Sequence, residues 1–107
     1  MEIGLSDNEI SKINEVFSSF PEIEKVIVFG SRAKGNFRAG SDIDLTLIGS
    51  GLNLYFINEV NSKLDDLLMP YIFDLSILKQ IKNRDLTDHI NRVGKTFYKR
   101  QEKRLYK

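Results

Sequence analysis

The sequence predicts an α/β domain, of the α+β type, in which helices pack against a small mixed β-sheet. Apolar runs of strand length alternate with segments whose apolar residues recur at helical spacing, and this order is typical of such domains. The length of 107 residues suits one domain, and we expect residues 1–107 to form it. The hydrophobic content of 41% and the charged content of 29% are ordinary for a globular protein.

The N-terminal segment predicts an amphipathic helix followed by a buried strand. Ser6 and Glu9 have the spacing of a capping box, in which each side chain accepts from the backbone N–H of the other residue. The apolar run at residues 25–29 predicts a strand, and a short helix is expected over residues 31–34. Before this strand, apolar residues recur at helical spacing as far as Pro21, which ends the first helix: Ile10, Ile13, Val16, Phe17 and Phe20.

The middle of the chain predicts a strand and a long helix. Residues 42–48 form a second apolar run, and the Gly-Ser-Gly sequence after it breaks the strand. A helix is expected over residues 53–68, and Pro70 ends it. The apolar residues that predict this helix recur at helical spacing: Leu54, Ile57, Val60, Leu64, Leu67 and Leu68.

The last third of the chain predicts one more strand and a final helix. Residues 71–78 form a third apolar run, with Asp74 in its middle. The single histidine, His89, has no cysteine or second histidine with which to share a metal, so we interpret it as a polar residue on the final helix. This helix is weakened at Gly94, and its apolar residues recur at helical spacing: Leu86, Ile90, Val93 and Phe97.

The residue types exclude several classes of function. The chain contains no cysteine, which excludes disulfides, thiolate metal sites and cysteine nucleophiles and agrees with a cytoplasmic location. No signal peptide is expected, and no apolar run approaches the ~20 residues that span a bilayer. The net charge is +1, but residues 92–107 carry seven basic residues and one acid, Glu102. We interpret this basic C-terminal tail, about residues 95–107, as a solvated end, with residues 92–107 as an alternative contact for a partner protein. We expect neither a nucleic-acid nor a membrane partner.

Three acids lie where they could bind a metal. Asp42 and Asp44 share one face of their strand, while Ile43 and Leu45 share the other, because strand side chains alternate. Two such carboxylates repel each other and lose hydration unless a cation lies between them, and hard oxygen ligands suit magnesium. Asp74 is a buried acid within an apolar run, which is rare for an unpaired carboxylate. Asp74 either joins this metal site, pairs with an arginine or caps a turn.

The residues after the first strand could bind phosphate. Gly30 lets the backbone approach a phosphate closely, and Ser31 offers a hydroxyl and a backbone N–H at the start of the short helix. Arg32 is the first of several basic residues within reach of that charge, each of which could equally be a solvent-exposed loop charge. A Walker phosphate-binding loop is excluded because Asn36 stands where its lysine would be.

The sequence resembles a known family. Gly30-Ser31, ten further residues and the pair Asp42 and Asp44 resemble the signature of the nucleotidyltransferase superfamily that includes DNA polymerase beta. The short chain and the segments Phe-Gly-Ser-Arg-Ala-Lys-Gly and Gly-Ser-Asp-Ile-Asp-Leu resemble the minimal nucleotidyltransferases, typically antitoxin partners of HEPN-domain toxins. The resemblance covers roughly residues 10–97. It implies a polymerase beta-like fold with a third acid on a neighbouring strand, the place that Asp74 occupies.

The resemblance also implies an activity. Asp42, Asp44 and Asp74 would hold two Mg²⁺ ions about 3.5–4 Å apart, and Mn²⁺ could replace them. Gly30 and Ser31 would hold the phosphates of ATP. The enzyme would transfer a nucleoside monophosphate, AMP from ATP, to the hydroxyl group of a tyrosine in the cognate HEPN toxin. This modification would silence the toxin.

Two other functions stay open at this point. The domain could act without catalysis, by covering the toxin, although the intact acids and the Gly-Ser pair favour activity. A small-molecule adenylyltransferase of the aminoglycoside-modifying type has a similar pattern. Those enzymes usually carry an added helical domain, whereas this chain continues for only about thirty residues after Asp74.

Overall fold

The computed structural model describes residues 1–101, and it confirms an α/β domain built on a mixed sheet. Four strands, four α-helices and one 3₁₀ helix follow one another within these residues. Their order and bounds are α1 (Asp7–Ser18), β1 (Ile23–Phe29), α2 (Gly30–Lys34), β2 (Ile43–Gly49), α3 (Leu54–Asp65), β3 (Phe73–Ile77), η1 (Leu78–Gln80), α4 (Arg84–Val93) and β4 (Lys95–Lys99).

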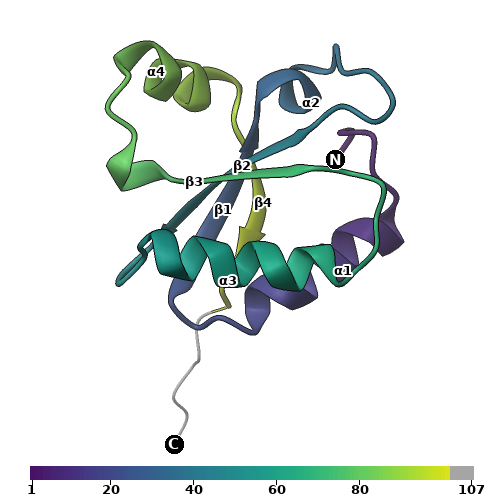
Figure 1. Cartoon of the computed structure of the whole chain (residues 1–107). Coiled ribbons are helices and arrows are strands. Elements are labelled where there is room, and N and C mark those ends of the chain that lie inside the picture. The colour runs from purple at the N-terminus through teal and green to yellow at the C-terminus, as the bar shows by residue number, and fades with distance from the viewer. Residues whose placement is uncertain (102–107) are drawn as a thin grey trace, which may run out of the picture.

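The four strands are arranged in the order β3-β2-β1-β4. β1 pairs with β2 and with β4 in antiparallel fashion, whereas β2 and β3 are parallel. A parallel pair needs a long crossover, and α3 provides it. α1 and α3 lie on one side of the sheet, and α2 and α4 lie on the other side (Figure 1). In this strand order β3 and β4 are the edge strands, and helices lie over both faces of the sheet.

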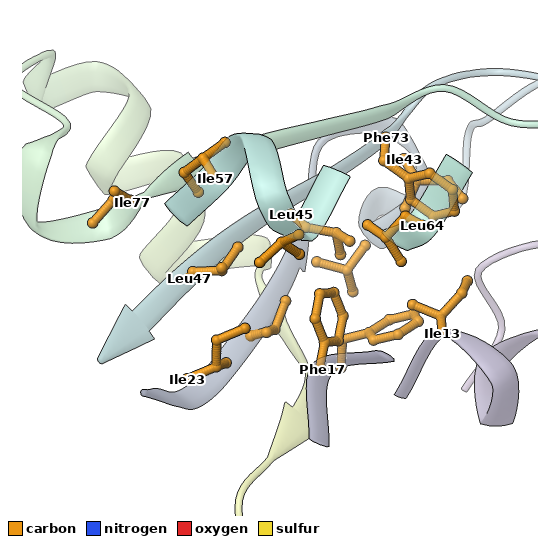
Figure 2. Close-up of a cluster of buried hydrophobic side chains, with 14 of the residues drawn as sticks. Ile13, Phe17, Ile23, Ile43, Leu45, Leu47, Ile57, Leu64, Phe73 and Ile77 are labelled. Atoms are coloured by element: carbon orange, nitrogen blue, oxygen red, sulfur yellow. The ribbon is translucent and has the colours of Figure 1, made fainter. Parts of the chain in front are cut away.

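The hydrophobic core lies between the sheet and the pair α1 and α3 (Figure 2). Phe17 of α1 and Leu64 of α3 are fully buried there, against the side chains of alternate β2 residues. Those β2 residues are Ile43, Leu45 and Leu47. Because strand side chains alternate, the residues between them, Asp44 and Thr46, point to the opposite face, which carries α2 and α4.

The first helix begins as the sequence predicts. The Ser6 hydroxyl accepts from the Glu9 backbone N–H at 3.0 Å, and the Glu9 carboxylate accepts from the Ser6 N–H at 2.9 Å, which completes the capping box. The second long helix ends earlier than predicted, at Asp65. Leu68, which the sequence placed in that helix, has a left-handed backbone with φ of 58° and an exposed side chain. None of the helices within residues 1–101 is both long enough and apolar enough to span a bilayer.

The end of the described chain differs from the prediction of a helix that continues to Phe97. α4 ends at Val93, and Gly94 has an extended backbone with φ of −62° and ψ of 144°. Phe97 belongs to β4, where its ring packs edge-on against Phe17 with centroids 6.2 Å apart. Residues 95–99 of the predicted basic tail therefore form a strand of the sheet. The final part of that tail, residues 102–107, lies outside the described residues.

Candidate active site

The register of the sheet brings the predicted site residues to one place. Phe29, the last residue of β1, lies opposite Asp44 in the antiparallel pair. Asp44 in turn lies beside Asp74 in the parallel pair. Gly30, which follows Phe29 and begins α2, completes a row that crosses β1, β2 and β3. Because partners in a parallel pair project to the same face, Asp44 and Asp74 both point to the side that carries α2 and α4.

Gly30 makes room for the Asp44 carboxylate. Its backbone is left-handed, with φ of 75°, a conformation that residues other than glycine rarely adopt. A Cβ atom at Gly30 would collide with Oδ2 of Asp44 and would lie 3.2 Å from its Cγ. The sequence predicted glycine here for the approach of a phosphate, and the structure adds a second reason, which is contact with the acid.

The three acids differ in their exposure. Asp44 is partly buried, whereas Asp42, just before the start of β2, and Asp74 are both exposed. The exposure of Asp74 corrects the expectation of a buried acid: Phe73 and Ile77 of the edge strand β3 enter the core, whereas Asp74 projects to the opposite face. Burial raises the pKa of the Asp44 carboxyl, and the charges of Asp74 and Asp42 and a hydrogen bond with Asp74 raise it further. His89 acts in the opposite direction and lowers the pKa of Asp44.

The chemistry of the acids suits a divalent cation, but the three are not preassembled around one. Within residues 1–101, no group of three His, Cys, Asp or Glu side chains is arranged as a metal-binding cluster. Burial and then the charges of Asp74 and Asp42 raise the pKa of Asp44, and a bound cation would offset the repulsion among these carboxylates. Carboxylate oxygens are the ligands that Mg²⁺ prefers. The donor set therefore fits magnesium, with Asp44 and Asp74 side by side and Asp42 close enough to act on the same carboxyl.

The short helix α2 is held at its start by His89 of α4. Phe29 at the N-cap position makes no side-chain cap, so the Gly30 N–H needs another acceptor. His89 supplies it, with Nε2 accepting from the Gly30 N–H at 3.1 Å. The histidine ring also packs edge-on against Phe29, with centroids 6.2 Å apart. His89 thus belongs to the site, which the sequence did not predict, because a lone histidine on a helix gives no signal of what it faces.

Ser31, the second residue of α2, is partly buried beside Gly30. Its carbonyl accepts from the Gly35 N–H at 2.9 Å and closes the helix, while Gly35 has a left-handed backbone with φ of 88°. The role expected of Gly30 and Ser31 in binding phosphate stays a prediction.

Arg32 has other partners than the phosphate that the sequence predicted for it. Its side chain is 1% exposed. Nε and Nη2 both donate to the carbonyl of Ser41, at 3.2 and 2.8 Å, and Nη1 donates to the carbonyl of Ile3 at 2.9 Å. The guanidinium carbon lies 5.3 Å from the ring centroid of Phe37 and 5.1 Å from that of Tyr71. In this arrangement Arg32 holds the loop that leads to Asp42.

Comparisons with known proteins agree with this geometry. The family model described as "Polymerase beta, Nucleotidyltransferase" matches residues 11–103. A search of curated proteins found no significant match.

Solved structures with a similar fold include several toxin–antitoxin complexes. One is a toxin–antitoxin with AMP-PNP, with a TM-score of 0.69 and 26% identity over 91% of this chain and 76% of that one. Another is a tri-AMPylated Shewanella oneidensis HEPN toxin in complex with an MNT antitoxin, with a TM-score of 0.66, 21% identity and coverages of 89% and 73%. A third, the toxin–antitoxin MntA-HepT, has a TM-score of 0.66, 21% identity and coverages of 88% and 73%.

Proposed function

Because the chain belongs to the polymerase beta nucleotidyltransferase family, we propose that it transfers AMP from ATP to a hydroxyl group of a HEPN-domain toxin and so acts as the antitoxin. The observation that carries this proposal is the placement of Asp44 beside Asp74, with Gly30 next to them at the start of α2. A row of acids beside a Gly-Ser turn is what transfer from a nucleoside triphosphate requires, since cations and phosphates must meet there.

Two of the similar structures support the choice of nucleotide and acceptor. A toxin–antitoxin complex that shares 26% identity with this chain contains AMP-PNP, an analogue of ATP. The more distant complex contains a HEPN toxin that carries AMP. For this chain, ATP as the donor and a HEPN toxin as the acceptor are proposals that extend the family assignment.

The metal site that we propose consists of Asp42, Asp44 and Asp74. Two Mg²⁺ ions, or Mn²⁺ in their place, would activate the attacking hydroxyl and stabilise the leaving pyrophosphate. Burial raises the pKa of the Asp44 carboxyl, the charges of Asp74 and Asp42 raise it further, and bound cations would offset that repulsion. The chain's own contribution is to hold Asp44 and Asp74 in register on β2 and β3 while leaving Asp42 and Asp74 exposed.

The phosphates of ATP are assigned to Gly30 and Ser31. The Ser31 hydroxyl and the backbone N–H groups at the start of α2 are donors that suit the β- and γ-phosphates. The Gly30 N–H already donates to His89, so the hydroxyl and N–H of Ser31 are the donors that we assign to phosphate in this conformation.

The acceptor hydroxyl is proposed to come from a second protein. Asp42 and Asp74 are both exposed, so the three acids are open to a docking partner. A partner that docks there would supply the hydroxyl and exclude water from the reacting groups. We assign part of the contact to the basic end of the chain, from Arg92 at the end of α4 through β4.

Intact-mass spectrometry tests the proposal. The purified protein is mixed with ATP, Mg²⁺ and a HEPN-domain protein, to be sought in the neighbouring gene, and this partner should gain the mass of one or more AMP units. Asp42→Asn and Asp74→Asn should abolish the gain. Asp65→Asn is the matched control, because Asp65 is an exposed acid at the end of α3, and this variant should retain full activity. A tight complex without added mass under any nucleotide or metal would replace catalysis by simple covering of the toxin. Transfer to an aminoglycoside and not to the protein would favour the small-molecule function.

A further inference from the structure

We propose that Arg32 is a positioning residue that fixes Asp42 through the Ser41 carbonyl and thereby sets the affinity of the site for a divalent cation. This inference rests on the proposed function, because it takes Asp42 as a metal ligand. Arg32 itself touches neither a cation nor a phosphate in this proposal.

The hydrogen bonds of Arg32 converge on the peptide group next to Asp42. Nε and Nη2 grip one oxygen, the Ser41 carbonyl, at 3.2 and 2.8 Å. That carbonyl belongs to the same planar peptide unit as the Asp42 N–H, so fixing the oxygen fixes the orientation of the Asp42 backbone. Hydrogen bonds from a charged donor are stronger than neutral ones, and the rigid fork of a guanidinium adds directional specificity.

Asp42 is anchored on both sides. On its C-terminal side, the Ile43 N–H donates to the carbonyl of Ile72 at 2.9 Å and joins β2 to the start of β3. On its N-terminal side, the anchor is the bond from Arg32 to Ser41. The loop before Asp42, residues 35–41, contains Gly35 and Gly40 with left-handed backbones. Without the arginine, little besides a single turn bond from the Ser41 N–H to the carbonyl of residue 38 would hold the end of this loop.

The guanidinium is itself held firmly. The rings of Phe37 and Tyr71 both lie within cation–π distance of it. The Tyr71 hydroxyl donates to Glu9 at 3.0 Å, which connects this cluster to α1. The N-terminal segment closes the cluster, since Ile3 accepts from Nη1 and a Cβ atom on Gly4 would lie 2.7 Å from the same nitrogen. A side chain fixed by so many contacts can transmit its position to the loop.

Positioning and simple electrostatics predict opposite signs for the loss of Arg32. Removal of a positive charge near a cation site would, by relief of Coulomb repulsion alone, strengthen cation binding. Removal of the contact that orients Asp42 would weaken it, and groups that orient metal ligands typically account for about 10–100-fold in metal affinity. Arg38 provides the comparison, because it is an exposed arginine in the same loop.

The experiment measures Mn²⁺ binding to the full chain by electron paramagnetic resonance, with no nucleotide or partner present. Arg32→Met should weaken Mn²⁺ binding about tenfold or more, whereas Arg38→Met should leave it unchanged or slightly stronger. Arg32→Lys keeps the charge but loses the planar fork, so it should also weaken binding, and it decides the question if Arg32→Met does not fold. Circular dichroism checks that each variant is folded.

Three results would overturn the inference in different ways. If the wild type binds Mn²⁺ and folded Arg32→Lys binds it equally well, Arg32 does not position Asp42, while the metal site of the proposed function stands. If the wild type binds no Mn²⁺ up to millimolar concentrations, the proposed metal site fails and this inference fails with it. Equal shifts in Arg32→Met and Arg38→Met would assign the effect to charge alone.

Discussion

Gly30→Ala should destabilise the protein mainly through one contact, that between the new methyl group and the Asp44 carboxylate. The left-handed backbone of Gly30 costs any other residue about 1–2 kcal/mol. The collision of the Cβ atom with Oδ2 of Asp44 should add about 1–3 kcal/mol, the usual penalty of overpacking. The sum, about 2–5 kcal/mol, is a large part of the stability of a domain of this size.

A second substitution separates the two terms. In an Asp44→Ala background, the colliding oxygen and Cγ are gone, and the remaining Cβ lies 3.5 Å from the added methyl, an ordinary contact. Gly30→Ala should then cost only the backbone term, so the coupling energy between the two positions should be about 1–3 kcal/mol. Gly35→Ala is the matched control, because Gly35 also has a left-handed backbone but a Cβ atom added there would meet no atom within 4 Å.

Urea denaturation followed by circular dichroism gives the four free energies of unfolding that form the cycle. Each kcal/mol should also move the melting temperature by about 4–8 °C. The gain that alanine brings by restricting the unfolded chain is the same in both backgrounds and cancels. A cost of Gly30→Ala that is the same with and without the Asp44 carboxylate, within about 0.5 kcal/mol, would refute the close approach of these residues.

Three further results are expected. Asp44→Asn should raise the melting temperature at pH 7 without divalent cations, because burial and the neighbouring acids raise the pKa of the Asp44 carboxyl. Ionisation of this carboxyl therefore lowers the stability of the wild type as the pH rises above 3.8. A gain in melting temperature that does not shrink toward pH 4 would contradict this reasoning. His89→Leu should lower the free energy of unfolding by about 1–3 kcal/mol, because the Gly30 N–H loses its acceptor. His89→Gln retains an acceptor and should lower the free energy of unfolding less. Equal losses for the two variants in urea denaturation would argue against the hydrogen bond. Ser31→Ala should weaken ATP binding by about 1–3 kcal/mol in calorimetry without changing the melting temperature, and unchanged affinity would place the phosphates elsewhere.

The parts of the fold that the sequence predicts are those with local signals. The capping box of Ser6 and Glu9 needs only residues three apart, and its two hydrogen bonds are present. The apolar runs of β1, β2 and β3 are likewise readable, because a buried strand must be apolar whichever strand it pairs with. The proximity of Asp44 and Asp74 was expected from the resemblance, and the parallel register supports it.

The parts that the sequence did not predict depend on contacts between distant residues. β4 presents a single buried side chain, Phe97. Phe97 happens to continue the helical spacing of the apolar residues in α4, so the sequence placed it in that helix. The burial of Arg32 and the contact of His89 with Gly30 join elements 29 and 59 residues apart. Composition and periodicity contain no information about such pairs. The exposure of Asp74 depends on which face of the edge strand β3 enters the core, which is also a property of the assembled fold.

The parallel pairing of β2 with β3 limits how the gene can change in length between α3 and β3. Asp74 shares a face with Asp44 while its neighbour Phe73 enters the core. Insertion of one codon in the stretch for residues 66–72, if it slid β3 by one position, would exchange those two side chains between the faces. Insertion of two codons would restore the face but move the carboxylate by about 7 Å along the strand. Evolution of this connection should therefore proceed by substitution, with insertions and deletions tolerated only where the loop itself bulges out to absorb them.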